Sequence, residues 1–200
     1  MNTTPSTGTE PAPEPLLARP KRADARRNYD KVVTAAREEF TERGTSASLE
    51  EIARRAEVGI GTLYRNFPNR QALLEAVYVD EVDSLCQSTV GLDELPAWEA
   101  FATWVDRLVG YLATKQALAQ ELLEYFDRDA PLFRSCRASL FRAGEPLLQR
   151  AQREHAVRAD TDLGEVIQIV GGIAKIPALE PEQTRHMLQI ALDGLRYRPA

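Results

Sequence analysis

The feature that most constrains this sequence is a pair of short helices joined by a turn too tight for an ordinary loop. The pair is expected in residues 48–67, which read SLEEIARRAEVGIGTLYRNF. Ser48 and Glu51 have the spacing of a capping box. Ala53 is small where the two helices would cross, and Val58 and Leu63 would fill the space between them. The pattern predicts a helix-turn-helix, whose second helix enters the DNA major groove with its N-terminus first. A tight corner between two helices of an all-helical protein would produce the same pattern.

The remainder of the chain also follows helical periodicity, with no credible segment of period two. Apolar residues from about position 25 repeat at three- and four-residue spacing, and Gly44 stands where a left-handed cap would end that helix. Pro68 would stop the second short helix, and Asn69 would cap the next one, from about Arg70 to Asp93. Further helices are expected at about 96–112, 118–126, 131–155 with a kink at 144–146, 160–175 and from 181 onward. The sequence therefore predicts an all-α fold of about nine helices, with a three-helix helix-turn-helix head and a helical second domain.

Charge is distributed unevenly along the 200 residues. The net charge is −2 over residues 1–18, +4 over residues 19–70 and −7 over residues 71–200. A basic unit followed by a larger acidic one indicates a head that binds a polyanion and a body with another role. The first 20 residues are rich in proline and threonine, which is typical of a disordered tail. The expected organisation is a tail at 1–20, a DNA-binding head at 21–85 and a second domain at 86–200.

Several classes of protein are excluded by the composition. No apolar run approaches the roughly 20 residues of a membrane span, and the N-terminus lacks the apolar core of a signal peptide. We therefore expect a cytoplasmic, nucleoid-associated protein with no membrane partner. Cys86 and Cys136 form no CxxC pair, and the only histidines are His155 and His186, so a disulfide framework and a zinc finger are excluded. We predict no metal, no cofactor and no enzymatic activity, because no nucleophile–base pair or glycine-rich phosphate loop stands out.

The apolar first helix, the capping box and the run IGTLYRNFPNRQALLEAV closely resemble the N-terminal DNA-binding domain of the TetR family of bacterial repressors. The resemblance covers about residues 25–80. Over residues 81–200 only the number and lengths of the helices match, with a looser likeness to the SbtR-type ligand-binding half. The resemblance disfavours a purely structural helix corner and implies a DNA-binding head.

By this resemblance, the second helix of the motif carries the DNA contacts. Arg65 would contact base edges, where an arginine fork can bind both acceptors of a guanine. Tyr64 and Asn66 would hold phosphates, although Tyr64 could instead pack on the neighbouring helix and Asn66 could be a frayed helix end. The leading end of the recognition helix would comprise Gly59, Ile60, Gly61 and Thr62, and weaker phosphate candidates are Thr45 and Ser48.

Two positions carry physical arguments of their own. Arg70 would place a cation in the first turn of a helix, which is unfavourable unless a phosphate binds there, so we expect a phosphate contact or a solvated side chain. Glu57 stands where the family's turn normally has glycine, at a site that requires positive φ. Glu57 should therefore be strained, or the turn differs from that of the family.

The second domain offers candidate residues for a ligand pocket and a dimer interface. Eight aromatic side chains could line a pocket between helices, although each could equally be ordinary core: Trp98, Phe101, Trp104, Tyr111, Tyr125, Phe126, Phe133 and Phe141. Adjacent glycines inside an apolar helix favour close helix approach, unless the helix ends before them. The interface candidates are Val166, Ile169, Val170, Gly171, Gly172, Ile173, Leu188 and Leu195.

These observations lead to a functional hypothesis and two competing ones. The resemblance implies a homodimeric transcriptional regulator, and specifically a repressor, that binds a palindromic double-stranded DNA operator and is released by an unknown small molecule. A helical enzyme or carrier with an accessory head is one alternative. A constitutive nucleoid-type DNA binder is the other, and the acidic body disfavours it.

Overall fold

The computed structural model describes residues 19–176 and 180–197, in which all regular secondary structure is helical. The α-helices are α1 (Ala23–Arg43), α2 (Leu49–Arg55), α3 (Ile60–Asn66), α4 (Arg70–Gln87), α5 (Ala97–Leu122), α6 (Pro131–Arg153), α7 (Leu163–Ala174) and α8 (Pro181–Leu195). Two short 3-10 helices are η1 (Gly44–Ser46) and η2 (Leu92–Glu94). The all-α prediction is confirmed. The predicted tail falls outside the described residues up to position 18.

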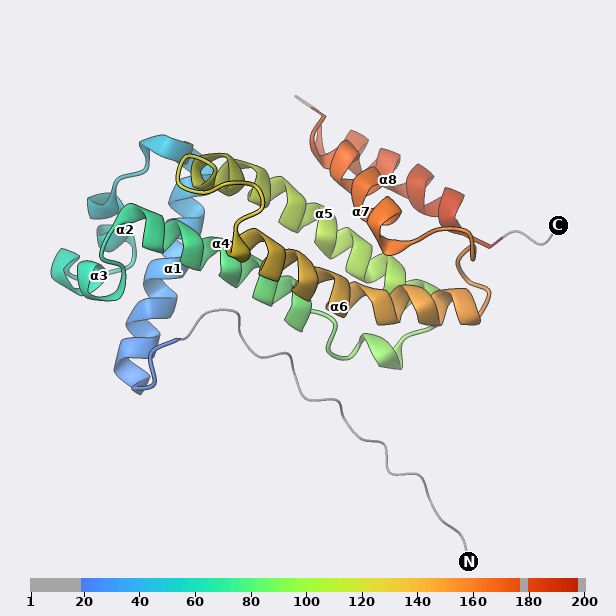
Figure 1. Cartoon of the computed structure of the whole chain (residues 1–200), viewed down its shortest axis with the longest axis horizontal. Coiled ribbons are helices and arrows are strands. Elements are labelled where there is room, and N and C mark those ends of the chain that lie inside the picture. The colour runs from blue at the N-terminus through green and yellow to red at the C-terminus, as the bar shows by residue number, and fades with distance from the viewer. Residues whose placement is uncertain (1–18, 177–179, 198–200) are drawn as a thin grey trace, which may run out of the picture.

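The helices form an elongated molecule with the helix-turn-helix at one end (Figure 1). Helices α1, α2 and α3 gather at that end, while α4, α5 and α6 run along the middle of the molecule. Helices α7 and α8 pack together at the other end. Because α4 contacts α1 as well as α5 and α6, it joins the head to the middle helices.

Local caps determine where the first helices begin and end. Gly44 adopts φ +55 after α1, and its N–H donates to Phe40 O. Asn69 caps α4 by accepting a hydrogen bond from the N–H of Ala72 at 2.8 Å. Helix α4 is shorter than expected and ends at Gln87, since the chain turns through Gly91 with φ +80.

Three predictions about the later helices are corrected or decided by the structure. The segments expected as separate helices at about 96–112 and 118–126 are largely one helix, α5, which ends at Leu122. Helix α6 continues through the expected kink and includes Pro146. Helix α7 also continues through Gly171 and Gly172, as the sequence predicted.

Gly144 explains how α5 and α6 approach each other so closely in the core. A Cβ atom built on this glycine would lie 2.6 Å from Cζ2 of Trp104, well inside van der Waals contact. The indole is fully buried, and no flexible side chain is available to move aside. The position therefore requires glycine because of packing.

Candidate nucleic-acid interface

The motif begins with a capped helix and a sharp turn. The Oγ atom of Ser48 accepts a hydrogen bond from the N–H of Glu51 at 3.1 Å, which is half of the expected capping box. In the turn, the N–H of Val58 donates to Ala53 O at 3.0 Å, and Glu57 adopts φ +55. The predicted positive φ at Glu57 is confirmed, so the turn keeps the left-handed geometry for which glycine is the usual residue.

Buried side chains hold α3 firmly against the other two helices of the head. Ile52 of α2 and Leu63 of α3 are completely buried, as the apolar spacing of the motif predicted. Phe67, just after α3, packs on Tyr29 of α1 with ring centroids 4.9 Å apart. The short α3 therefore depends on tertiary packing for its position, since a helix of this length has little stability alone.

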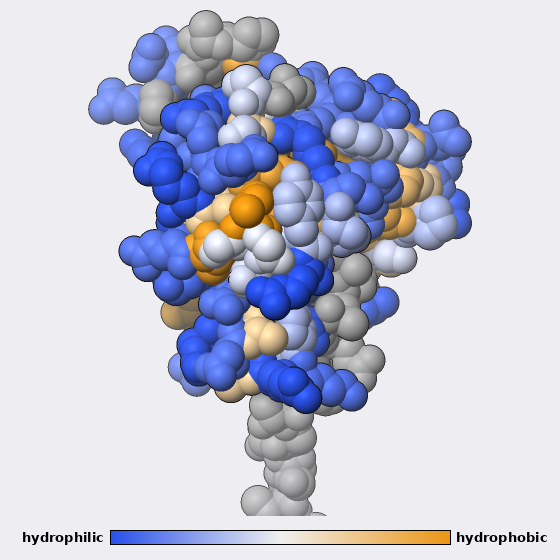
Figure 2. All heavy atoms as spheres, turned by 90° about the vertical axis from the view of Figure 1, so that its left-hand side faces the viewer, coloured by the Kyte–Doolittle hydropathy of each residue, from blue (hydrophilic) through white to orange (hydrophobic). Residues whose placement is uncertain are grey.

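The outer face of α3 carries most of the predicted DNA contacts on an exposed surface. Tyr64 is 45% exposed and does not pack into the head, and Ile60 is 39% exposed. The guanidinium of Arg65 donates to Gly61 O at 3.2 Å and to Thr62 Oγ1 at 2.9 Å, so this side chain lies back along its own helix. Figure 2 views this end of the molecule, which is largely hydrophilic around a small hydrophobic area.

The remaining motif residues are less prominent. Gly59 is the N-cap of α3 and is exposed. The Nδ2 group of Asn66 donates to Thr62 O at 2.9 Å, an interaction within α3. The Oγ atom of Ser48 accepts its capping hydrogen bond, and its O–H can still donate. Thr45 lies in η1, and its side chain lies outside what the structure describes.

The structure gives Arg70 surroundings that differ from both expectations. Its guanidinium is turned inward, where it forms an ion pair with Glu121 near the end of α5 and donates to Ala47 O. It also donates to Gly44 O at 3.4 Å and lies 4.9 Å from the ring centre of Phe40. Glu121 is buried, so Arg70 links the start of α4 to α1, η1 and α5 instead of pointing into solvent.

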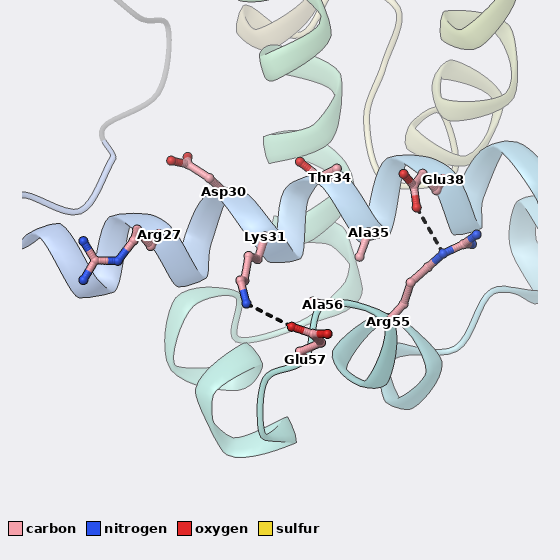
Figure 3. Close-up of a pocket in the computed structure, with 9 residues that line it drawn as sticks. All are labelled: Arg27, Asp30, Lys31, Thr34, Ala35, Glu38, Arg55, Ala56 and Glu57. Atoms are coloured by element: carbon pink, nitrogen blue, oxygen red, sulfur yellow. Dashed lines mark hydrogen bonds and ion pairs between the residues drawn. The ribbon is translucent and has the colours of Figure 1, made fainter.

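A groove of about 520 Å³ lies beside the motif, between α1 and the turn after α2 (Figure 3). The Nζ atom of Lys31 lies 3.2 Å from a Glu57 carboxylate oxygen across this groove. At its other end, Arg55 of α2 forms an ion pair with Glu38 of α1 at 3.0 Å. Arg55 also contacts two further carboxylates of α1, those of Glu39 and Glu42. The opposite charges leave no single sign dominant, so we assign the groove a structural role.

Phe126 and Phe133 pack together with ring centres 6.5 Å apart, but the eight aromatic residues proposed for a pocket do not all gather at one site. Fully or almost fully buried core residues are Phe101, Trp104 and Tyr111, while Tyr125 is 44% exposed in the turn after α5. Partly buried positions are Trp98, Phe126, Phe133 and Phe141. None of the eight lines the groove beside the motif. None lines a second groove either, which lies between Arg158–Asp160 and the end of α8.

The dimer candidates divide into inward and outward positions. The side chains of Val166, Val170, Ile173, Leu188 and Leu195 are buried within the chain and hold α7 and α8 to its core. Gly171 is also buried and lies against Leu112 of α5, since a Cβ there would be 3.8 Å from Cδ1. Ile169 is 46% exposed, and nothing lies within 4 Å of a Cβ built on Gly172. Only these last two candidates therefore face outward.

Sequence reasoning missed the ion pairs that connect distant segments. Arg19 and Arg37 converge on Asp80 of α4. Glu121 receives Arg70 from 51 positions away. These partners have no shared motif or helical spacing, so the sequence held no signal for them.

Among the described residues, no helix is both long enough and apolar enough to cross a membrane. Comparison with protein families matches residues 32–77 to the bacterial regulatory proteins of the TetR family. Residues 96–197 match the C-terminal domain of SbtR-like transcriptional regulators. The first match contains the whole helix-turn-helix, and the second contains α5 to α8.

Solved structures agree with the family matches. A TetR transcriptional regulator from Streptomyces coelicolor is 36% identical with a TM-score of 0.74, and the match covers 86% of this chain and 99% of that one. A TetR regulatory protein from Mycobacterium vanbaalenii is 31% identical with a TM-score of 0.73, over 88% and 99% of the two chains. The transcriptional regulator FadR from Bacillus subtilis, solved in complex with stearoyl-CoA, shares the fold: it is 19% identical with a TM-score of 0.57, and the match covers 84% of this chain and 100% of that one. The chain therefore belongs to the TetR family of transcriptional regulators, with a helix-turn-helix DNA-binding domain and an SbtR-like C-terminal domain.

Proposed function

We propose that this regulator is a repressor that binds a palindromic operator as a homodimer and leaves it when a small molecule binds the C-terminal helices. The observation that carries the proposal is the arrangement of the two ends of the chain. An exposed recognition helix with Tyr64 and Arg65 lies at one end, and exposed apolar residues of α7 and α8 lie at the other. We assign the head to residues 21–85 and the effector domain to residues 86–200.

We assign recognition of the DNA base sequence to α3. Arg65 would exchange its two hydrogen bonds within α3 for the acceptors of a guanine, and those bonds are exposed and therefore individually weak. Tyr64 and Asn66 would contact phosphates and set the register without reading sequence. The N-cap Gly59 and the first residues of α3, up to Thr62, would lie closest to the floor of the DNA major groove. Arg70 is no longer a phosphate candidate in this scheme, because it lies against the buried Glu121.

Dimerisation is assigned to the outer faces of α7 and α8. Ile169 and Ile190 are 46% and 60% exposed, and Gly172 has open space where a second helix could approach. A two-fold axis through this end would place two α3 helices on successive major grooves, about 34 Å apart.

Release requires a mechanical connection between the two domains, and Arg70 supplies the contacts for it. A shift of the end of α5 would move Glu121 and, through Arg70, the start of α4 and the η1 segment beside the motif. An effector that binds better to the shifted arrangement would lower operator affinity by the difference in its affinities for the two states.

The proposal is tested by selecting the genomic DNA fragments that the purified protein binds. We expect one shared palindrome and release of the complex by a fraction of cell extract. Arg65→Ala should cost about 1–3 kcal/mol at one base pair of each half-site, whereas Tyr64→Phe should weaken operator and scrambled DNA alike. Bound fragments without a shared sequence would refute operator recognition, and a complex that no fraction releases would refute the effector response.

A further inference from the structure

A lysine lies among the C-terminal helices without a carboxylate partner. Lys115 of α5 is partly buried, and its Nζ atom lies 5.4 Å from the ring centre of Tyr111, one turn earlier. The same atom lies 5.6 Å from the ring centre of Tyr78 on α4. Among the described residues, no Asp or Glu forms an ion pair with it or acts on its charge. We call Tyr78, Tyr111 and Lys115 the Lys115 cluster.

The charged side chains that act directly on Lys115 are cations, while the buried carboxylate of Asp83 on α4 acts on the neighbouring Cys136. Burial lowers the pKa of Lys115, and the nearby thiol of Cys136 on α6 opposes this shift. The cations Arg137 of α6 and Lys175 at the end of α7 lower the pKa further. Arg137 and Lys175 are both exposed, so they lie toward solvent while Lys115 lies deeper. The two tyrosine rings offset part of the cost of desolvating this ammonium group, and a bound anion would offset more of it.

The two tyrosines of the cluster supply hydrogen-bond donors beside the positive charge of Lys115. Burial raises the pKa values of Tyr78 and Tyr111, so both hydroxyls stay neutral and keep their protons. The two hydroxyls lie close enough to shift each other's pKa, and each O–H can donate a hydrogen bond to a further acceptor. Tyr78 also packs edge-on against Phe133 at 5.4 Å, which provides an apolar wall next to the polar groups.

We propose that the Lys115 cluster binds the anionic group of a small amphipathic effector, with a carboxylate as the simplest case. The ammonium group and a tyrosine hydroxyl would hold the two oxygens, and the apolar part would lie against the aromatic wall. Arg137 and Lys175 would attract the anion from solvent. This inference rests on the proposed function, because it specifies the chemistry of the effector that the C-terminal domain responds to.

The experiment uses the full-length protein and a panel of carboxylates, each matched by an alcohol and an amine with the same carbon skeleton. The carboxylates run from short straight chains to decanoate and from benzoate to phenylalkanoates. The chain contains four lysines, Lys21, Lys31, Lys115 and Lys175, so ¹³Cε-labelled lysine gives few NMR signals to assign. Carboxylates should shift the Lys115 signal and raise its pKa, and the best one should bind at least tenfold more tightly than its alcohol. The amines should not bind.

Matched variants separate this site from general effects of charge. Lys115→Met should lose the preference for carboxylates and still fold, because it replaces a partly buried charge with an apolar chain of similar length. Lys115→Arg should retain the preference. Lys21→Met makes the same chemical change on the exposed start of the head and should bind the panel like the wild type.

The inference is overturned if no carboxylate shifts the Lys115 signal, if acids and alcohols bind equally, or if Lys115→Met keeps the preference. A cell-extract fraction that releases operator DNA equally from wild type and Lys115→Met would overturn it too, while leaving the proposed function intact. Conversely, carboxylate binding at Lys115 with no release of operator DNA by any compound or fraction would support the site and refute the proposed effector response.

Discussion

Replacing Glu57 by glycine should stabilise the protein, because the turn of the motif holds this residue at φ +55. A residue with a Cβ adopts this conformation at a cost of about 1–2 kcal/mol. Glycine removes that cost but adds about 0.4–1 kcal/mol of unfolded-state entropy. The ion pair with Lys31 is also lost, and because the two side chains are 52% and 81% exposed it contributes at most a few tenths of a kcal/mol. The net expectation for Glu57→Gly is a gain of a few tenths to about 1 kcal/mol.

Two control variants isolate the backbone contribution. Glu57→Ala loses the ion pair but keeps the strain, so it should be about 0.5–1 kcal/mol less stable than Glu57→Gly. Glu57→Gln removes the charge alone and should lie within a few tenths of a kcal/mol of the wild type. Urea unfolding of the full chain at one fixed protein concentration measures all four proteins. An alanine variant as stable as the glycine variant would show that residue 57 is unstrained, and the turn geometry would then need revision.

Three further predictions concern packing and caps. Gly144→Ala should destabilise the protein by about 1–3 kcal/mol, because the new methyl group would overlap the Trp104 indole. The better helix propensity of alanine is too small to offset this cost. A thermal melt that shows an unchanged or higher Tm would contradict the prediction. Arg55→Met should cost about 1–3 kcal/mol in urea unfolding because the buried Glu39 carboxylate loses a partner, and an unchanged midpoint would disprove the role of this contact. Asn69→Ala should cost about 1 kcal/mol through loss of the α4 cap, whereas Asn69→Ser should largely preserve stability in the same assay.

The sequence by itself determined the features that depend on neighbours along the chain. The caps at Ser48 and Asn69 form because the accepting oxygen and the donating N–H are three residues apart. The positive φ of Glu57 was predicted from the glycine that the family's turn normally has at this position, and the alternative, a different turn, was left open until the structure decided it. The apolar spacing likewise placed Ile52 and Leu63 in the core of the head.

Only the tertiary structure decided which side chains meet across the fold. Arg70 carried a sound local argument for a phosphate, yet Glu121 from α5 occupies that position, and no helical spacing connects the two residues. Gly171 and Gly172 are equivalent in sequence, but helix rotation turns the first toward Leu112 and the second toward solvent. No sequence signal singles out Lys115, which becomes distinctive only because α4 brings Tyr78, and α6 and the end of α7 bring cations, beside it. The physical reason is that capping and turn energies are set within a few residues, whereas pairing and burial depend on how whole helices rotate and pack.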